Sequence, residues 1–213
     1  MIKTIIFDLD GVIVDSEPLH FEAHRMALAE RGVVLTLEDY LDFGVAQGDR
    51  HLYLKAAERN GIAIDYHEAI RRKRALYLEL FGQRGALRPG VIELIRRLHA
   101  GYSLAVASSS ARKIVHFVLN RFGLADAFRV VVTGDDVERV KPYPDIYEKA
   151  IEESGSLPIE CVAIEDSFSG LHSAVSAGVR CIVVPCEFTK CQDFSAACVV
   201  ASRFEDVAEH IDE

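Results

Sequence analysis

The sequence predicts an α/β fold: a doubly wound, Rossmann-like parallel sheet with a small all-helical domain inserted after the first strand. Short apolar runs rich in valine and isoleucine recur along the chain, and a segment with helical periodicity follows each of them. One interval, residues 17–81, breaks this alternation and shows helical patterns only. We therefore expect a core formed by residues 1–15 and 84–213, and a helical insertion formed by residues 16–83.

Short apolar runs are the predicted strands. Each is about four to six residues long and shows little alternation of apolar and polar side chains, as is typical of strands buried on both faces of a parallel sheet. They are Thr4–Asp8, Leu104–Ala107, Val130–Thr133, Cys161–Glu165, Val179–Val184 and a weaker run near Val199.

Prolines, glycines and polar caps delimit the predicted helices. The first helix of the core has Pro89 in its first turn and stops at Gly101. The other helices of the core contain Ile114–Phe122, Asp145–Ser154 and Gly170–Ala177, each followed by a glycine. Within the insertion, the predicted helices are Leu19–Arg31, Leu37–Asp42, Arg50–Arg59 and Tyr66–Phe81.

Composition limits the classes of function. Half of the 213 residues are apolar, and the 24 basic and 33 acidic residues give a net charge of −9, which argues against sequence-independent nucleic-acid binding. No apolar run is long enough to span a bilayer, and Asp8 and Asp10 interrupt the stretch that a signal peptide would need. We expect a cytoplasmic monomer that binds neither nucleic acid nor membrane, with its five cysteines as free thiols.

Acidic and hydroxyl side chains follow the predicted strands, at the sheet edge where open α/β sheets bind ligands. Taken alone, each of these groups is typical of a turn or a helix cap, but together they indicate phosphoryl transfer to a carboxylate. Mg²⁺, a lysine and hydroxyl donors would neutralise the transferred group. The side chains are Asp8 and Asp10, then Ser108, Ser109 and Ser110, then Asp135 and Asp136, then Lys141, and last Glu165 and Asp166.

These motifs resemble those of the haloacid dehalogenase-like hydrolases over essentially the whole chain. "FDLDGVIVDSE" resembles the first motif of the family, Ser108 the second, Lys141 in "VKPYPD" the third and "IEDSFSG" the fourth. The insertion between the first two motifs corresponds to the helical cap of the family. The resemblance implies a Mg²⁺-dependent phosphatase that acts on a small phosphomonoester, such as a sugar phosphate, through an aspartyl-phosphate.

The resemblance also implies a role for each motif residue. Asp8 would be the nucleophile, and Asp10 the general acid and base. Ser108 and Lys141 would hold the phosphoryl oxygens. Mg²⁺ would bind Asp8, the backbone carbonyl of Asp10 and Asp166, with Glu165 supporting it directly or through another ligand. Gly11 would let the backbone turn close to the phosphate.

Within the family, the chain resembles the β-phosphoglucomutase-like branch, which includes many sugar phosphatases. Two departures favour hydrolysis and leave the mutase as the second candidate. Gln47 stands where the mutase has an arginine for the distal phosphate, with Arg50 a candidate replacement, and Ala111 stands where the mutase has a lysine. The resemblance and the phosphate loops together give these candidate substrate-binding residues: Gly11, His20, Gln47, Arg50, Lys73, Ser109 and Ser110.

Two other classes fit less well. Dehalogenases of the same family lack a second aspartate at the position of Asp10, because a halide leaving group needs no protonation. A phospho-accepting signalling receiver also gathers acids, a hydroxyl and a lysine at its strand ends. Receivers, however, are much shorter than this chain and have no helical insertion after the first strand.

Other conspicuous patterns in the insertion are expected to be structural. "RRKR" at residues 71–74 is expected to form a solvated helix surface, and the aromatic residues Tyr53, Tyr66, Tyr77 and Phe81 to form a core. Among the eight histidines, only His20 has a functional interpretation.

Overall fold

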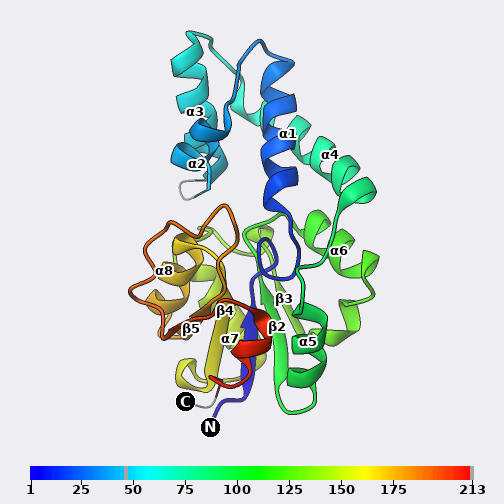
Figure 1. The fold of residues 1–213 in the computed structure, drawn as a ribbon, viewed down its shortest axis with the longest axis vertical. Coiled ribbons are helices and arrows are strands. Elements are labelled where there is room, and N and C mark those ends of the chain that lie inside the picture. The colour runs from blue at the N-terminus through cyan, green and yellow to red at the C-terminus, as the bar shows by residue number, and fades with distance from the viewer. Residues whose placement is uncertain (46–47, 212–213) are drawn as a thin grey trace. The chain divides into compact units, whose positions relative to one another are not determined.

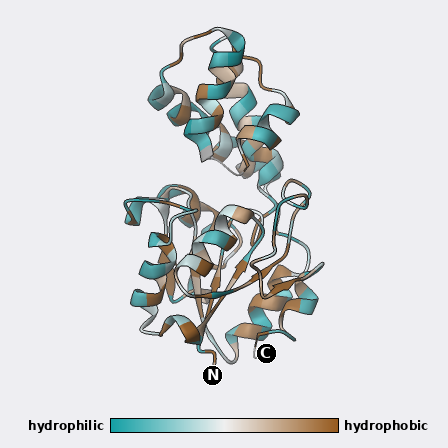
Figure 2. Cartoon of the chain, turned by 90° about the vertical axis from the view of Figure 1, so that its left-hand side faces the viewer, coloured by the Kyte–Doolittle hydropathy of each residue, from teal (hydrophilic) through white to brown (hydrophobic). Residues whose placement is uncertain are grey.

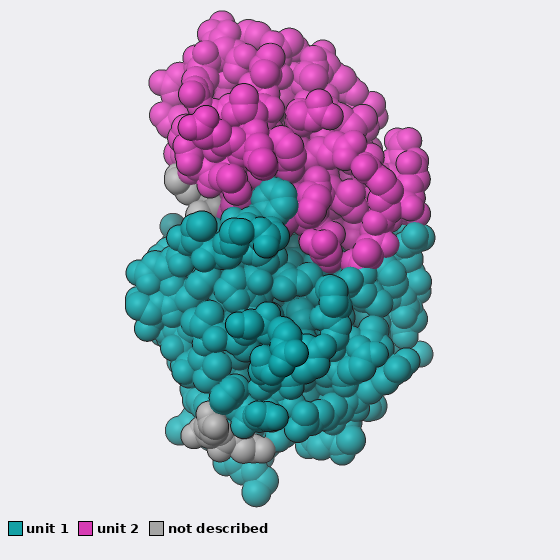
Figure 3. All heavy atoms as spheres, viewed as in Figure 1, with its two compact units in different colours: residues 1–14, 87–213 teal, residues 15–86 magenta. Residues whose placement is uncertain are grey.

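The computed structural model describes residues 1–45 and 48–211. Contacts divide the chain into two compact units, coloured separately in Figure 3. Unit 1 comprises residues 1–14 and 87–213, and unit 2 comprises residues 15–86. The chain therefore passes from one unit to the other twice, after residue 14 and after residue 86.

Unit 1 contains a parallel sheet of six strands, and the predicted fold class is confirmed (Figure 1). The strands lie in the order β3-β2-β1-β4-β5-β6, so that β1 is central and the chain crosses to its other side between β3 and β4. Each predicted apolar run forms one of these strands: β1 (Thr4–Phe7), β2 (Ser103–Ala107), β3 (Val130–Val132), β4 (Cys161–Glu165), β5 (Arg180–Val183) and β6 (Val199–Val200).

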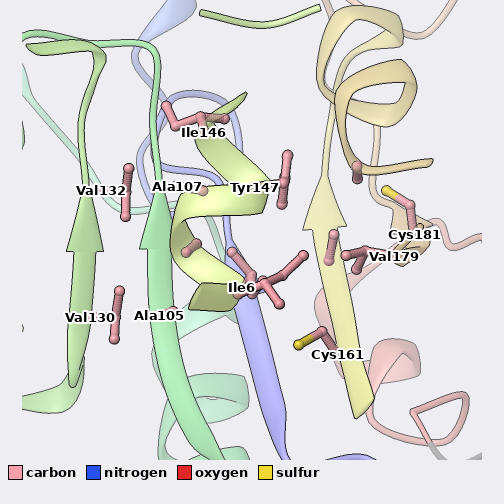
Figure 4. Packing of buried hydrophobic residues seen from close by; sticks show 14 of the residues in the cluster. Ile6, Ala105, Ala107, Val130, Val132, Ile146, Tyr147, Cys161, Val179 and Cys181 are labelled. Carbon is pink, nitrogen blue, oxygen red and sulfur yellow. The ribbon is translucent and has the colours of Figure 1, made fainter. Parts of the chain in front are cut away.

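Both faces of the sheet are covered. Consecutive residues of β1 point to opposite faces, yet Ile5, Ile6 and Phe7 are all fully buried. On one face, Ile6 packs with Ile146 and Tyr147 of α7 (Asp145–Ser154), as Figure 4 shows. Figure 2 shows how apolar residues dominate the strands, whereas the helices carry both apolar and polar residues. Burial of each large apolar side chain contributes roughly 1.5–3 kcal/mol.

The other helices of unit 1 follow the strands, and one boundary corrects a prediction. Pro89 lies outside α5, because the next residue, Gly90, has a left-handed backbone (φ 83°) that cannot continue into a helix, and α5 starts at Val91. The helices are α5 (Val91–His99), α6 (Arg112–Arg121), α8 (Phe168–Ser176) and α9 (Phe204–Val207), with short 3₁₀ turns η1 (Ala125–Ala127), η2 (Gly134–Asp136) and η3 (Pro158–Glu160).

The described part of unit 2 consists of helices and the loops that join them, and it contains no strand. It contains α1 (Glu17–Ala29), α2 (Leu37–Phe43), α3 (Gly48–Asn60) and α4 (Tyr66–Arg84). Thr36 and Asp39 form a capping box at the start of α2, in which each side chain bonds the backbone N–H of the other residue. Tyr53, Tyr77 and Phe81 are fully buried, which confirms the interpretation of these three residues as a core, whereas Tyr66 is half-buried.

Two expectations about the chemistry of the chain can be compared with the structure. The five cysteines all lie in the described residues, and none of them forms a disulfide bond. Among the described residues, none of the helices is both long enough and apolar enough to cross a bilayer.

Candidate active site

Asp8 lies at the carboxyl end of the central strand, between the ends of its two neighbours. Phe7 pairs with Val106 of β2 and with Ile164 of β4. The backbone N–H of Asp8 donates to the carbonyl of Ile164 at 3.0 Å and extends this pairing by one residue. The strand order therefore places the Asp8 side chain beside the residues that follow both β2 and β4.

Lys141 joins two carboxylates at this point. Its Nζ donates to Oδ1 of Asp8 at 2.8 Å and to Oε1 of Glu165 at 2.6 Å, and its side chain is only 6% exposed. Burial opposes the charge of the ammonium, but Asp8 and Glu165 more than compensate and raise the pKa of Lys141 above its usual value. Lys141 is therefore a buried cation held by two acids that come from different strands.

Three buried carboxylates form an acidic cluster here. Oxygen atoms of Asp8, Glu165 and Asp166 lie within 4.8 Å of one another. Burial raises the pKa of Asp8 to about 8; Lys141 opposes this shift, and Glu165 and Asp10 add to it. Three acids thus share this space with the ammonium of Lys141. Three carboxylates whose oxygens lie this close together form the all-oxygen donor set that Mg²⁺ prefers.

The serines after β2 approach the second aspartate of the first motif. Oγ of Ser110 donates to Oδ2 of Asp10 at 2.6 Å, and the N–H of Ser110 donates to Oγ of Ser108 at 3.1 Å. Ser108 is fully buried, whereas Ser109 is exposed. Residues about 100 positions apart in the sequence therefore meet, as the strand-end pattern implies.

Gly11 is the residue at which the first motif turns. Its φ of 78° favours glycine, and a Cβ at this position would overlap the carboxylate of Asp166. Gly11 thus permits the acid that follows β4 to pack directly against the backbone that follows β1.

The acids that follow β3 do not join the acidic cluster. Oδ2 of Asp136 accepts from the N–H and the hydroxyl of Thr133, at 2.9 and 2.5 Å, and closes the η2 turn. Asp135 accepts from the backbone N–H of Arg112, whose guanidinium pairs with Asp136. These two acids fix the connection between β3 and Lys141, which is a structural role.

Sequence reasoning missed two residues that touch the cluster. Oη of Tyr147 donates to Oε1 of Glu165 at 2.6 Å. Oγ1 of Thr189 lies 3.4 Å from Oδ2 of Asp166 and accepts from the N–H of Cys186. Tyr147 follows the apolar periodicity of α7, and its only signal is that a buried tyrosine hydroxyl needs a partner. Thr189 lies in an irregular segment after β5 and has no such signal.

The candidate substrate-binding residues of unit 2 differ in how deeply they are buried. His20 is buried and stacks on Tyr77, with ring centroids 4.0 Å apart. Lys73 is buried too, with Nζ 3.6 Å from Oδ2 of Asp49, so the solvated interpretation of residues 71–74 is wrong for this lysine. It falls on the same face of α4 as Tyr77, one turn away. The three neighbouring arginines are exposed, as expected, and so is Arg50, while Gln47 lies outside the described residues.

His24 is a buried histidine that the sequence did not single out. Its Nε2 lies 3.2 Å from Oδ1 of Asp49, and its Nδ1 lies 3.1 Å from the hydroxyl of Tyr53. Burial, with Lys73 adding to it and Asp49 opposing it, lowers the pKa of His24 to about 4. His24 is therefore a neutral member of a polar cluster inside unit 2.

Comparison with known proteins gives matches over nearly the whole chain. The sequence profile of the family described as haloacid dehalogenase-like hydrolase matches residues 5–184. Protein CbbY of Rhodobacter capsulatus is 37% identical over 210 residues, covering 92% of this chain and 91% of that protein. Hexitol phosphatase B of Escherichia coli is 31% identical over 189 residues, covering 86% and 84% of the two chains.

A solved structure extends this similarity to the fold. CbbY of Rhodobacter sphaeroides, crystallised with xylulose-(1,5)bisphosphate, superposes with a TM-score of 0.87 at 32% identity, and the match covers 96% of this chain and 95% of that one. The profile match includes all of unit 2 and every residue of the acidic cluster.

Proposed function

Because the chain belongs to the haloacid dehalogenase-like hydrolases, we propose that it is a Mg²⁺-dependent phosphatase of small phosphomonoesters, sugar phosphates in particular. The family and the relatives named as phosphatases establish an enzyme of the phosphatase type. One observation in this chain carries the finer proposal. A buried lysine holds Asp8 next to two further acids, and the three carboxylates together offer the oxygen ligands that a divalent cation requires.

The proposed reaction has two steps on Asp8. Its carboxylate attacks phosphorus, the bond to the ester oxygen breaks, and Asp10 gives its proton to the departing oxygen. Asp10, now a carboxylate, takes a proton from water, which attacks the aspartyl-phosphate and releases inorganic phosphate and free Asp8. The hydroxyl of Ser110, which donates to Asp10 at 2.6 Å, would hold this acid in place.

Two groups of residues would stabilise the phosphoryl oxygens. Lys141 has one N–H beyond the two that donate to Asp8 and Glu165, and the buried hydroxyl of Ser108 lies at the adjacent strand end. When bound at Asp8, Asp166 and the carbonyl of Asp10, with Glu165 supporting it directly or through another ligand, Mg²⁺ would neutralise charge on the phosphoryl group.

The substrate class rests on the relatives and on unit 2. Relatives include a hexitol phosphatase and a phosphorylated carbohydrates phosphatase, and the CbbY structure holds a sugar bisphosphate. In this proposal, residues 15–86 act as the cap of the family, and their side chains select the substrate. The candidates are His20, Lys73, Arg50 and Gln47.

β-Phosphoglucomutase is the second candidate, and the sequence disfavours it. A mutase must hold a sugar bisphosphate while this intermediate reorients in the site. Gln47 and Ala111, however, are neutral where charged residues are expected. Charge-assisted hydrogen bonds are roughly twice as strong as neutral ones, so water should compete successfully for the aspartyl-phosphate.

Phosphorus NMR on a panel of sugar phosphates with Mg²⁺ tests this proposal. We expect inorganic phosphate and free sugar from the accepted substrates. For β-glucose 1-phosphate with a trace of the 1,6-bisphosphate, we expect little glucose 6-phosphate. Accumulation of glucose 6-phosphate without inorganic phosphate would instead assign the mutase activity. No reaction with any member of the panel would remove the sugar phosphates as the substrate class.

A further inference from the structure

We propose that Tyr147 is a positioning residue for the phosphoryl group, and that it acts through Glu165 on the direction of the Lys141 ammonium. This inference rests on the proposed function, in which Lys141 contacts a phosphoryl oxygen. Neither the sequence motifs nor the relatives assign a role to Tyr147.

The argument begins with one oxygen atom of Glu165. Its Oε1 accepts from Oη of Tyr147 at 2.6 Å and from Nζ of Lys141 at 2.6 Å. A carboxylate oxygen has two lone pairs near its plane, so two donors fill them. Because Tyr147 occupies one lone pair, Lys141 is directed to the other.

The direction of Lys141 then follows from its two acceptors. An ammonium has three N–H donors, and two of them point to Asp8 and Glu165. Fixing these two bonds fixes the third N–H as well, although the four-carbon stem of lysine is flexible. Nζ also lies 5.3 Å from the centroid of the Tyr147 ring. The ring of Tyr147 therefore lies against the Lys141 ammonium, and its hydroxyl directs this ammonium through the shared oxygen of Glu165.

Packing from three elements keeps this arrangement rigid. Tyr147 of α7 and Glu165 of β4 are both fully buried. A Cβ at Gly170 of α8 would overlap the carboxyl group of Glu165, so the acid fills the space between α7 and α8. The backbone nitrogen of Asp166 lies 3.3 Å from Oε2, the second carboxylate oxygen of Glu165. Glu165 thus has little freedom to compensate for a lost partner.

Removal of the tyrosine hydroxyl should act on phosphate binding more than on metal binding. Tyr147→Phe keeps the ring and its packing but frees one lone pair of Oε1, so that Lys141 is drawn further toward Glu165. We expect the inhibition constant of inorganic phosphate and the KM of p-nitrophenyl phosphate to rise by about tenfold, the effect of one charged hydrogen bond. The dissociation constant of Mg²⁺, measured by calorimetry without substrate, should change less than about twofold.

A matched control removes the same kind of bond elsewhere. The buried Tyr40 donates its hydroxyl to Oε2 of Glu17 at 2.9 Å, within unit 2. Tyr40→Phe should therefore leave the phosphate inhibition constant unchanged, and circular dichroism should show that both variants are folded. Equal phosphate inhibition of Tyr147→Phe and wild type would overturn the inference, as would parallel losses of Mg²⁺ and phosphate affinity.

A double-mutant cycle tests the path through Glu165. If Tyr147 acts by way of this acid, Tyr147→Phe should add almost nothing to the effect of Glu165→Gln on phosphate inhibition. Additive effects would contradict that path. Wild-type protein that releases no phosphate with Mg²⁺ would refute the proposed function and this inference with it, whereas an active wild type with an unaffected Tyr147→Phe refutes the inference alone.

Discussion

Charge compensation decides the behaviour of the individual acids at this site. Asp8, Glu165 and Asp166 are buried together, and Lys141 is the cation that their described contacts include. Burial raises the pKa of Asp8 well above its usual value, which disfavours the ionised carboxylate that a nucleophile needs. A divalent cation at the cluster would reverse this by favouring the ionised acid.

The need for a cation beside Asp8 predicts that phosphatase activity depends on a divalent metal. Activity should require Mg²⁺ and be lost after treatment with EDTA, and Ca²⁺ should bind but inhibit. Ca²⁺ accepts more oxygen ligands in looser geometry and can hold Asp8 through both of its oxygens, away from the line of attack. Phosphate release measured in Mg²⁺, in EDTA and in Ca²⁺ checks this expectation. Undiminished turnover in metal-free buffer would contradict it.

The positions of the strand ends in the sequence indicate which motif residues meet. They do not indicate which other side chains contact those motif residues. Asp8, Lys141, Glu165 and Asp166 are found together because consecutive parallel strands end at the same edge. Tyr147 was not predictable in the same way, because its position on α7 is explained fully by packing. The burial of Lys73 was not predictable either, because three exposed arginines surround it in the sequence.

Among the secondary-structure elements, α8 has an unusual requirement for glycine. A change from glycine to alanine within a helix normally stabilises it by up to about 1 kcal/mol. Gly170→Ala should instead lower both the melting temperature and the turnover number, because its Cβ would displace the buried carboxyl group of Glu165.

Gly101 offers the matched control for this prediction, because a Cβ there meets open space. Gly101→Ala should leave activity unchanged and the melting temperature equal or slightly higher. Thermal unfolding and phosphate release of both variants provide the comparison. If Gly170→Ala behaves like Gly101→Ala, Glu165 is not confined as described.

The helices of unit 2 enclose a cluster that should weaken the fold in acid. His24 on α1 faces His20 of the same helix, Asp49 and Tyr53 of α3, and Lys73 of α4. Its pKa is about 4 when folded and about 6.5 when unfolded. Between these values the unfolded chain binds a proton that the folded chain does not, so the free energy of unfolding falls as pH falls, by up to about 1.4 kcal/mol per pH unit.

Substitution of His24 isolates this contribution. His24→Gln keeps a hydrogen-bonding side chain that does not titrate, and should lose less stability than wild type between pH 7 and pH 5. His99→Gln makes the same change at an exposed histidine of α5 and should decline with pH as wild type does. Urea unfolding at several pH values measures both. An identical decline of His24→Gln and wild type would show that His24 does not cause it.

For the molecule as a whole, the break in the strand–helix alternation was the most informative feature of the sequence. It predicts a helical insertion, and contacts within residues 15–86 form a unit separate from the sheet. The α/β alternation likewise predicts the sheet, because strands joined by helical crossovers must run parallel. Helix boundaries were harder to predict, as at Pro89, because the sequence does not show whether a glycine such as Gly90 lies within a first helical turn or, as here, precedes it with a left-handed backbone.

The central claim is that Asp8 attacks phosphorus, and one substitution tests it most directly. Asp8→Asn preserves the shape of the side chain but removes its nucleophilic charge. We expect Mg²⁺-dependent release of phosphate from p-nitrophenyl phosphate to fall by about three orders of magnitude or more, while the protein stays folded by circular dichroism. Near-wild-type release by folded Asp8→Asn would contradict the aspartyl-phosphate mechanism.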